Sequence, residues 1–455
     1  MQKEILVHKF GGEIAGNQKY LRKCIEIIKN KNKRYSNIIV VSALGGVTSN
    51  LVEGSFYFSE NGSEKEIDNH LDKLKKIHYE KLENLKESEI IREKINNGLC
   101  QLKKYFQGIN LLEETSTKMV DKILVFGEKF SSEIFSGYFM EENIKVKTLS
   151  GSSIGIITND RYGDADILWA HTKGRIRKKL KPLLEKGITP IITGFDGKTK
   201  KNEITTLGRG GSDTTACVIG RDLKVKEVNL YKTTKGVTTA DPKIVENAMT
   251  IPFLNYSESM AAGKIIHRKG IEHARKGKIP LIVRYLLDQK VKTVINGKGN
   301  KSKNIKMVTY EPNCYLIEVQ DSKMAEEQGH QEIITGLIAE NKVNLKLTRD
   351  SFNGLVFVSD GYAEKGDIKL LEENLKERYC GVKIVPNMAI IRVIGSLGFN
   401  HVESSQFNEI IHKYIHKKEM CIGSYPYTNA CSLDGVAPGA RLKEIIHELH
   451  NELIR

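Results

Sequence analysis

Residues 205–216 read Thr-Thr-Leu-Gly-Arg-Gly-Gly-Ser-Asp-Thr-Thr-Ala, a stretch in which glycines and hydroxyl side chains surround one arginine and one aspartate. Residues 212–221 follow a helical pattern, so the glycines precede a helix N-terminus, where free N–H groups favour an anion. Arg209 offers a planar guanidinium suited to a carboxylate. Ser212 or Asp213 could instead cap the helix, and both roles can coexist. The density of ligand-type residues favours a binding site.

Short apolar runs and helical patterns alternate on both sides of this stretch. This order is typical of β-α-β units with a buried parallel sheet. A region rich in Leu, Ile, Lys and Glu and free of proline, residues 65–122, predicts a helical insertion beside the sheet. The expected strands are residues 4–10, 37–42, 145–149, 188–195, 226–231 and 280–285, and the expected helices are residues 20–30, 129–142 and 212–221.

Two more glycine-containing loops follow predicted strands. The first is Lys9-Phe10-Gly11-Gly12, and the second runs from Ser42 to Thr48 with two glycines and two hydroxyl groups. Because the carboxyl ends of parallel strands meet at one sheet edge, we expect both loops there, with Lys9 facing an anion. Taken alone, the Lys9 motif would equally fit a tight turn with a surface lysine.

The totals describe a chain of 455 residues, long enough for two or three domains, with 40% hydrophobic and 28% charged residues. It has no apolar stretch long enough to cross a bilayer, and residues 1–10 lack signal-peptide features, so we expect no membrane and a cytoplasmic protein. Seven scattered cysteines without a Cys-x-x-Cys pair indicate reduced thiols. The net charge of +15 comes from short, separated clusters, which favours a solvated surface over a nucleic-acid partner.

The chain changes character after a polar region rich in Lys, Asn and Gly at residues 296–306. We expect one α/β domain at residues 1–290 and a linker at residues 291–312. Beyond it, strands and helices alternate twice in a β-α-β-β order. The strands expected there are residues 315–320, 345–348, 355–358, 382–385, 388–394 and 424–434. This repeat predicts two ferredoxin-like α+β modules, at residues 313–386 and 387–455.

These motifs together resemble the aspartate kinase branch of the amino-acid kinase family. The chain lacks a Gly-x-x-x-x-Gly-Lys-Ser/Thr loop and the protein-kinase motifs. The two C-terminal modules resemble the paired ACT domains of that family. The resemblance implies an α/β fold, a three-layer αβα sandwich kinase domain of the amino-acid kinase type followed by two ferredoxin-like (ACT) modules. It covers residues 4–287 and rests on Lys9 to Gly12, Ser42 to Thr48, Gly127-Glu128, Gly194-Phe195, residues 205–216 and Gly236 to Pro242.

The resemblance implies that ATP, with Mg²⁺, phosphorylates the β-carboxylate of L-aspartate to give 4-phospho-L-aspartate, on the way to lysine, threonine and methionine. That carboxylate is ionised at pH 7, so catalysis needs alignment and charge neutralisation and no general base. Lys9 and Asp213 are the implied catalytic residues, and no metal ligand of the protein is assigned. The implied aspartate-binding residues are Ser42, Thr48, Glu128, Phe195, Arg209, Gly210 and Ser212. The implied nucleotide-binding residues are Lys9, Gly11, Gly12, Lys232, Thr233, Thr238, Lys243 and Lys264.

A few positions depart from the family pattern. Glu13 follows the glycines where a hydroxyl residue is usual, residues 232–235 lack the usual aspartate, and Thr238 replaces a common aromatic. These departures predict weaker nucleotide binding. They leave open a catalytically weak paralogue that senses an amino acid through its ACT-like modules. A kinase for a different acid is a third possibility, opposed by the loop from Ser42 to Thr48 and by the tandem modules.

The expected C-terminal modules also suggest how the chain associates. Ferredoxin-like modules expose sheet edges and often pair across subunits, so a homodimer through these modules is expected. The resemblance further implies an amino-acid effector, such as lysine, threonine or another end product, at an ACT interface.

Overall fold

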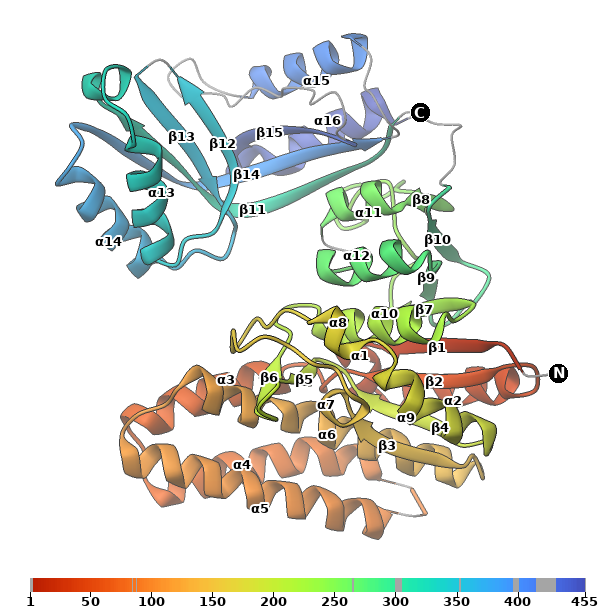
Figure 1. Ribbon diagram of the computed structural model, residues 1–455. Helices are drawn as coiled ribbons and strands as arrows, with labels where there is room; N and C mark the ends of the chain where they lie inside the picture. Colours follow the sequence, from red (N-terminus) through yellow and green to blue (C-terminus); the bar gives the residue numbers. More distant parts are fainter. Residues whose placement is uncertain are drawn as a thin grey trace. The chain divides into compact units, whose positions relative to one another are not determined.

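The computed structural model in Figure 1 describes residues 3–83, 85–86, 88–263, 266–298, 305–351, 353–395, 401–414 and 431–454. The chain divides into two compact units, one of residues 1–237 and 250–300 and the other of residues 238–249 and 301–455. Residues 238–249, expected within the first domain, therefore belong to the second unit. This segment carries Thr238 and Lys243, two of the predicted nucleotide-binding residues.

An eight-stranded sheet forms the centre of the first unit, in the order β3-β4-β2-β1-β7-β9-β10-β8. Neighbouring strands are parallel except for β9 and β10. The central strands β1 and β2 are buried along nearly their whole length, as expected for strands covered on both faces. The strands are β1 (Ile5–Phe10), β2 (Ser36–Val41), β3 (Val146–Ser150), β4 (Thr189–Thr193), β7 (Glu227–Lys232), β8 (Phe253–Asn255), β9 (Leu281–Tyr285) and β10 (Lys292–Asn296).

Helices cover both faces of this sheet, which makes the predicted three-layer sandwich (Figure 1). On one face, α2 (Gln18–Asn32) and α6 (Thr117–Glu141) share a core with Phe10. The neighbouring Lys9 points to the opposite face because side chains alternate along a strand. That face carries α9 (Arg175–Glu185), α10 (Gly211–Leu223) and α12 (Arg268–Gly277), which pack on one another.

The helices of the expected insertion are α4 (Glu64–Tyr79) and α5 (Ser88–Leu112), which pack with α3 (Val47–Glu60) and α6. The sequence predicted a separate helix at residues 129–142, but α6 continues unbroken from Thr117. Gly127 lies in its middle, and a Cβ atom there would stand 2.8 Å from the Cβ of Ala43. The glycine therefore lets α6 approach the loop that follows β2.

A five-stranded antiparallel sheet, in the order β12-β13-β11-β14-β15, forms the second unit. Two halves of β11 pair with two halves of β14, so a single sheet serves both modules. One half packs with α13 (His330–Glu340) and α14 (Lys365–Lys376), and the other with α15 (His401–Lys413) and α16 (Leu442–Leu453). The strands are β11 (Ile305–Gln320), β12 (Leu345–Ser351), β13 (Gly354–Ser359), β14 (Gly381–Gly395) and β15 (Ser432–Pro438).

Residues 238–249 pack into the half of this unit that holds α16. The Val308 N–H donates to the Thr239 carbonyl at 2.8 Å, and Thr239 Oγ1 lies 2.9 Å from His450 Nε2. Ala240 and Val245 are buried in the same core. Apolar burial and two hydrogen bonds therefore hold the segment in the second unit.

Several strands differ from the sequence expectation. The range 291–312, expected as a linker, contains β10 and the first half of β11. The strands expected at residues 382–385 and 388–394 form one strand, β14, because Asn387 takes a φ of 57° that shifts the register without ending the pairing. The strand expected at residues 424–434 lies mostly outside the described residues, and β15 begins at Ser432.

No helix in the described part of the chain combines the length and the apolar composition needed to span a bilayer. The six cysteines within the described residues are free thiols, and the seventh, Cys421, lies outside them.

Candidate active site

Lys9 and Asp213 form the centre of the candidate site. Lys9 is near the end of β1, and Asp213 is in the first turn of α10, which crosses that strand. Lys9 Nζ lies 2.7 Å from Asp213 Oδ1, and Lys232 Nζ, from the end of the adjacent strand β7, lies 3.9 Å from Oδ2. Both side chains of the closer pair are buried. The two residues predicted as catalytic are therefore in direct contact.

The charges of this cluster determine its protonation. Burial alone would raise the pKa of Asp213, but the ammonium groups of Lys9 and Lys232 outweigh it and lower that pKa. Asp213 in turn raises the pKa of Lys232, while burial and the charge of Lys9 lower it overall. Two cations around one carboxylate leave an excess positive charge, which is available to a phosphate group.

Glycine at position 210 determines how α10 enters the site. Gly210 caps the helix with a φ of 64°, and a Cβ atom on it would stand 2.2 Å from the Cβ of His267. Only glycine fits both the backbone angle and this space. The result is a helix N-terminus whose first residues, Gly211, Ser212 and Asp213, are buried at the site.

Glu128, on α6, brings a second carboxyl group. The Ala43 N–H donates to its Oε1 at 3.1 Å, while its buried Oε2 has no hydrogen-bond partner among the described residues. Burial raises the pKa of Glu128 to about 8, with a further contribution from Asp196. A buried carboxyl oxygen without a partner is costly unless a ligand completes it. Glu128 is therefore well placed to receive a cationic group of a substrate.

The two predicted glycine loops pack against each other. A Cβ atom on Gly12 would stand 2.6 Å from the Ala43 carbonyl oxygen, and the Gly45 N–H donates to the Gly12 carbonyl at 3.3 Å. The second loop ends where Gly46, with a φ of 82°, begins α3. Ser42 and Thr48 are both half-buried, and the Ser42 N–H donates to the Phe10 carbonyl at 3.2 Å, so Ser42 lies beside the first loop.

The loop after β4 contacts the start of α10. Phe195 has a φ of 79°, and its N–H donates to Thr215 Oγ1 at 3.1 Å. A Cβ atom on Gly194 would stand 2.4 Å from the Ser212 Cβ, so glycine is required for this approach. Phe195 and Ser212, both predicted to bind aspartate, therefore lie together.

Glu13 and Thr233, two of the positions that depart from the family pattern, contact each other. The Thr233 hydroxyl donates to Glu13 Oε2 at 2.6 Å, and this bond joins the loop after β7 to the short helix α1 (Gly12–Ala15) that follows β1. Glu13 is exposed, and its charge reaches the neighbouring Lys232. These two departures, at Glu13 and Thr233, therefore form one hydrogen-bonded feature close to Lys232.

The remaining predicted residues are less closely grouped. Arg209 is exposed just before α10. Thr238 and Lys243 belong to the second unit, so their contact with a nucleotide stays a prediction. Lys264 lies outside the described residues.

Sequence reasoning missed two residues of this region. Asp196 is buried and accepts hydrogen bonds from the Gly151 and Ser152 N–H groups and from the Thr193 hydroxyl, which fixes the loop that presents Phe195. Its position directly after Gly194-Phe195 could have indicated it. His267 contributes to lowering the pKa of Asp213 and packs on Gly210. It lies far from both residues along the chain, so no local sequence pattern indicated it.

A lysine–aspartate pair at a helix N-terminus, on the carboxyl edge of a mostly parallel αβα sheet, suits a phosphoryl-transfer enzyme that lacks a P-loop. The chain belongs to the amino acid kinase family, which it matches over residues 4–285. Its relatives are aspartokinases. It is 28% identical over 408 residues to aspartokinase 1, chloroplastic, of Arabidopsis thaliana, covering 86% of this chain and 70% of that protein. It is 26% identical over 466 residues to lysine-sensitive aspartokinase 3 of Escherichia coli strain K12, covering 99% of each.

Solved structures share its fold. E. coli aspartokinase III in complex with aspartate and ADP, in the R-state, gives a TM-score of 0.84 at 23% identity, over 99% of this chain and 100% of that one. The same enzyme with lysine and aspartate, in the T-state, gives 0.80 at 23% identity, over the whole of both chains. Clostridium acetobutylicum aspartate kinase gives 0.72 at 18% identity, over 98% of this chain and 99% of that one.

Proposed function

We propose that this protein is an aspartate kinase, a phosphotransferase with a carboxyl group as acceptor. It transfers the γ-phosphoryl group of ATP to the β-carboxylate of L-aspartate, giving 4-phospho-L-aspartate, the first step toward lysine, threonine and methionine. The observation that carries this proposal is the contact of Lys9 and Lys232 with Asp213 at the start of α10. Its relatives include aspartokinases, which supports aspartate as the substrate.

Aspartate binds, in this proposal, between α6 and the start of α10. The free oxygen of Glu128 receives the substrate ammonium group, which restores the partner that this buried carboxyl lacks. Arg209 holds a substrate carboxylate through its planar guanidinium. The residues that complete the aspartate site are Ser42, Thr48, Phe195, Gly210 and Ser212.

The transfer step needs no proton movement. An oxygen of the β-carboxylate attacks the γ-phosphorus and forms a new O–P bond. The bond to the bridging oxygen breaks, and ADP leaves with that electron pair. Lys9 neutralises the transferring group, and Asp213 holds Lys9 and Lys232 in position around it.

The nucleotide lies, in this proposal, along Gly11, Gly12, Lys232 and Thr233, with Thr238, Lys243 and Lys264 as further contacts. Mg²⁺ bound to ATP supplies additional charge neutralisation, and it commonly keeps waters beside one or two carboxylates. In the described part of the chain, no group of three or more His, Cys, Asp or Glu side chains could form a metal cage. Asp213 is the carboxylate that would face this ion.

The second unit supports regulation and association. We propose a homodimer formed through the ACT-like modules, because the sheet of this unit has two edge strands, β12 and β15. Light scattering of the full chain should give about twice its 51.3 kDa, and a monomeric mass would contradict the dimer. An amino-acid effector is proposed because lysine is bound in one E. coli aspartokinase III structure. Rates that do not change across an amino-acid panel would remove it.

The cytoplasm is the proposed compartment. Six described cysteines are free thiols, which suits a reducing environment. Localisation by fractionation of the source cells tests this assignment.

The deciding experiment is an aspartate-dependent, ATP-consuming assay with hydroxylamine trapping of the acyl phosphate. Lys9→Met and Asp213→Asn keep the shape of each side chain and remove its charge. Each should lower kcat by about 10²- to 10³-fold, as the loss of one transition-state contact commonly does. Lys19→Gln, an exposed residue of α2, is the matched control and should keep the parent rate.

A folded parent protein without turnover would refute the kinase. It would favour the catalytically weak paralogue that senses an amino acid through its ACT-like modules. A parent that turns over glutamate faster than aspartate would refute the substrate and leave the phosphoryl-transfer site in place.

A further inference from the structure

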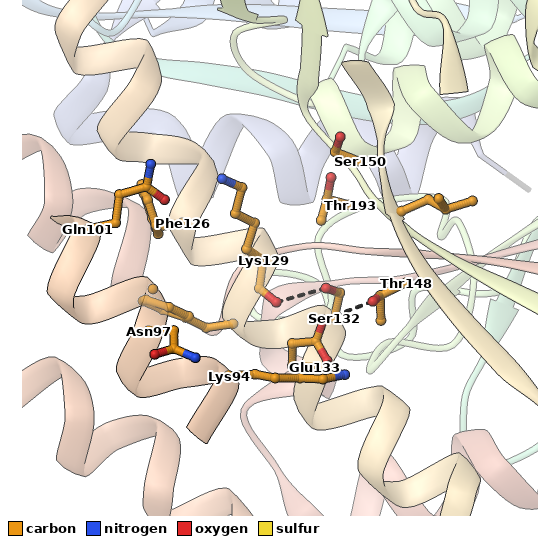
Figure 2. Close-up of a pocket in the computed structure, with 13 residues that line it drawn as sticks. Lys94, Asn97, Gln101, Phe126, Lys129, Ser132, Glu133, Thr148, Ser150 and Thr193 are labelled. Atoms are coloured by element: carbon orange, nitrogen blue, oxygen red, sulfur yellow. Dashed lines mark hydrogen bonds and ion pairs between the residues drawn. The ribbon is translucent and has the colours of Figure 1, made fainter. Parts of the chain in front are cut away.

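A pocket of about 330 Å³ lies in the first unit, between α5, α6 and the carboxyl ends of β3 and β4 (Figure 2). This volume falls within the range of small-molecule sites. None of its lining residues is among those assigned to aspartate or to the nucleotide. The polar residues that line it are Lys94, Asn97, Gln101, Lys129, Ser132, Glu133, Thr148, Ser150 and Thr193.

The one acidic side chain of this pocket is already neutralised. Lys94 Nζ lies 2.7 Å from Glu133 Oε2, and the Thr148 hydroxyl donates to Glu133 Oε1 at 2.8 Å. Lys94 and Glu133 therefore cancel each other's charge, and both carboxylate oxygens are engaged. The charge that remains in the pocket comes from Lys129.

Lys129 is a cation without an anionic partner within the described residues. Its Nζ lies 4.4 Å from the centre of the Phe126 ring, which attracts an ammonium group through its electron-rich face. Partial desolvation lowers the pKa of Lys129, although the negative charge of Asp196 opposes this. The side chain is still accessible to solvent, so a ligand can reach it.

We infer that this pocket binds a small organic anion, with a carboxylate or phosphate group on Lys129 and a polar body beside the amides of Asn97 and Gln101. An anion would supply the missing charge partner, and the Phe126 ring already holds the ammonium in place. An ammonium or apolar ligand would leave Lys129 unpaired and desolvated, which is unfavourable.

The position of the pocket connects it to the aspartate site. Lys129 follows Glu128 on α6, and the Thr193 hydroxyl at the pocket wall donates to Asp196 Oδ1 at 2.6 Å. Asp196 fixes the loop that carries Phe195. This part of the inference rests on the proposed function: an anion in the pocket should change KM for aspartate more than KM for ATP.

The test is limited acetylation of the full-length protein at lysine, read residue by residue by peptide mass spectrometry. Succinate and inorganic phosphate are the probes, and sodium chloride at equal ionic strength is the control for screening. Either probe should slow acetylation of Lys129 several-fold and leave Lys104, an exposed lysine of α5, unchanged. Protection by succinate alone identifies a carboxylate site, and protection by phosphate alone identifies a phosphate site. Equal acetylation of Lys129 with and without both probes would overturn the inference.

Two variants separate this pocket from the active site. Protection of Lys129 should persist in Lys9→Met, because that lysine belongs to the phosphoryl-transfer site; its loss there would place the anion at the active site and overturn the inference. In the kinase assay, the probe that protects Lys129, succinate or phosphate, should shift the aspartate KM of the parent and of Lys104→Gln but not that of Lys129→Gln. An equal shift in Lys129→Gln would refute the connection. If the anion protects Lys129 but the full-length protein shows no kinase activity, the pocket is supported and only the proposed function is refuted.

Discussion

Glu128 shows how one side chain can link burial to substrate binding. Its carboxyl group is held by one backbone N–H and is otherwise desolvated, which raises its pKa to about 8. At neutral pH it is therefore largely protonated in the free protein, and a substrate ammonium would favour its ionised form.

The pH dependence of aspartate binding should reflect this ionisation. KM for aspartate should fall by roughly 20-fold between pH 6.5 and 8.5, because the ionised fraction of a group with a pKa of about 8 rises from about 3% to about 76% over this range. Glu128→Gln, which cannot ionise, should raise KM and lose this dependence. Steady-state kinetics at several pH values measure both effects. Parallel pH profiles for parent and variant would contradict the role of Glu128.

The raised pKa of Glu128 affects stability in the opposite direction: a rise in pH should favour aspartate binding but lower the free energy of unfolding. A raised carboxyl pKa in the folded state means that the unfolded chain releases this proton first. The contribution of Glu128 to the free energy of unfolding is therefore lost as the pH rises from about 4.5 to about 8.

At the scale of elements, the ends of β1 and β7 are joined by the hydrogen bond between Glu13 and Thr233. These strands are neighbours in the sheet, so their following loops meet at its carboxyl edge. The same edge carries Lys9 and Lys232. The exposed carboxylate of Glu13 therefore lies where the phosphates of a nucleotide are proposed to bind.

Removing this charge should improve nucleotide binding. Glu13→Gln keeps an acceptor oxygen for Thr233 and should lower KM for ATP by about 1.4- to fivefold, since exposed charge interactions amount to about 0.2–1 kcal/mol. KM for aspartate should stay the same. Glu26→Gln, an exposed position on α2, is the matched control for loss of a negative charge. An unchanged KM for ATP in Glu13→Gln would show that the carboxylate lies outside the nucleotide path.

At the scale of the whole chain, buried neutral histidines link stability of the first unit to pH. His8 is fully buried on β1, where it contacts Tyr231 and Asn37, and burial lowers its pKa to about 3. His78, buried on α4, has its pKa lowered to about 4, again by burial. Both groups bind a proton in the unfolded chain at a pH where the folded chain does not.

The free energy of unfolding should therefore fall as the pH drops below about 6.5, and it should go on falling toward pH 4. Each histidine contributes about 1.4 kcal/mol per pH unit in this window. Urea denaturation followed by fluorescence of Trp169, the single tryptophan and a residue of the first unit, measures the slope. His78→Leu should reduce the slope, whereas His171→Gln, an exposed control, should keep it. Equal slopes in all three proteins would contradict the assignment.

Most of the first unit could be predicted from local pattern. The informative patterns are short: they are the apolar runs of β1, β2 and β7 and the glycines before α10. The sequence alone therefore indicated the parallel sheet, its carboxyl-edge loops and the motif that carries Asp213. The sequence pattern missed β10 because residues 291–312 were interpreted as a linker. It divided α6, which contains Gly127, because residues 65–122 were assigned to the insertion and residues 129–142 to a separate helix. The close approach of Gly127 to Ala43, a residue distant in the chain, is what requires glycine at position 127.

Local sequence pattern was enough to predict the class of fold, the glycine loops expected to bind an anion, and the lysine and aspartate of the candidate site, since each depends on residue types at short spacing. The remaining features became visible in the folded structure. It placed Lys9 2.7 Å from Asp213, gave Glu128 a carboxyl oxygen without a partner, joined Glu13 to Thr233, and moved residues 238–249 into the second unit. These features depend on contacts and desolvation between residues distant in the chain, which no local pattern encodes.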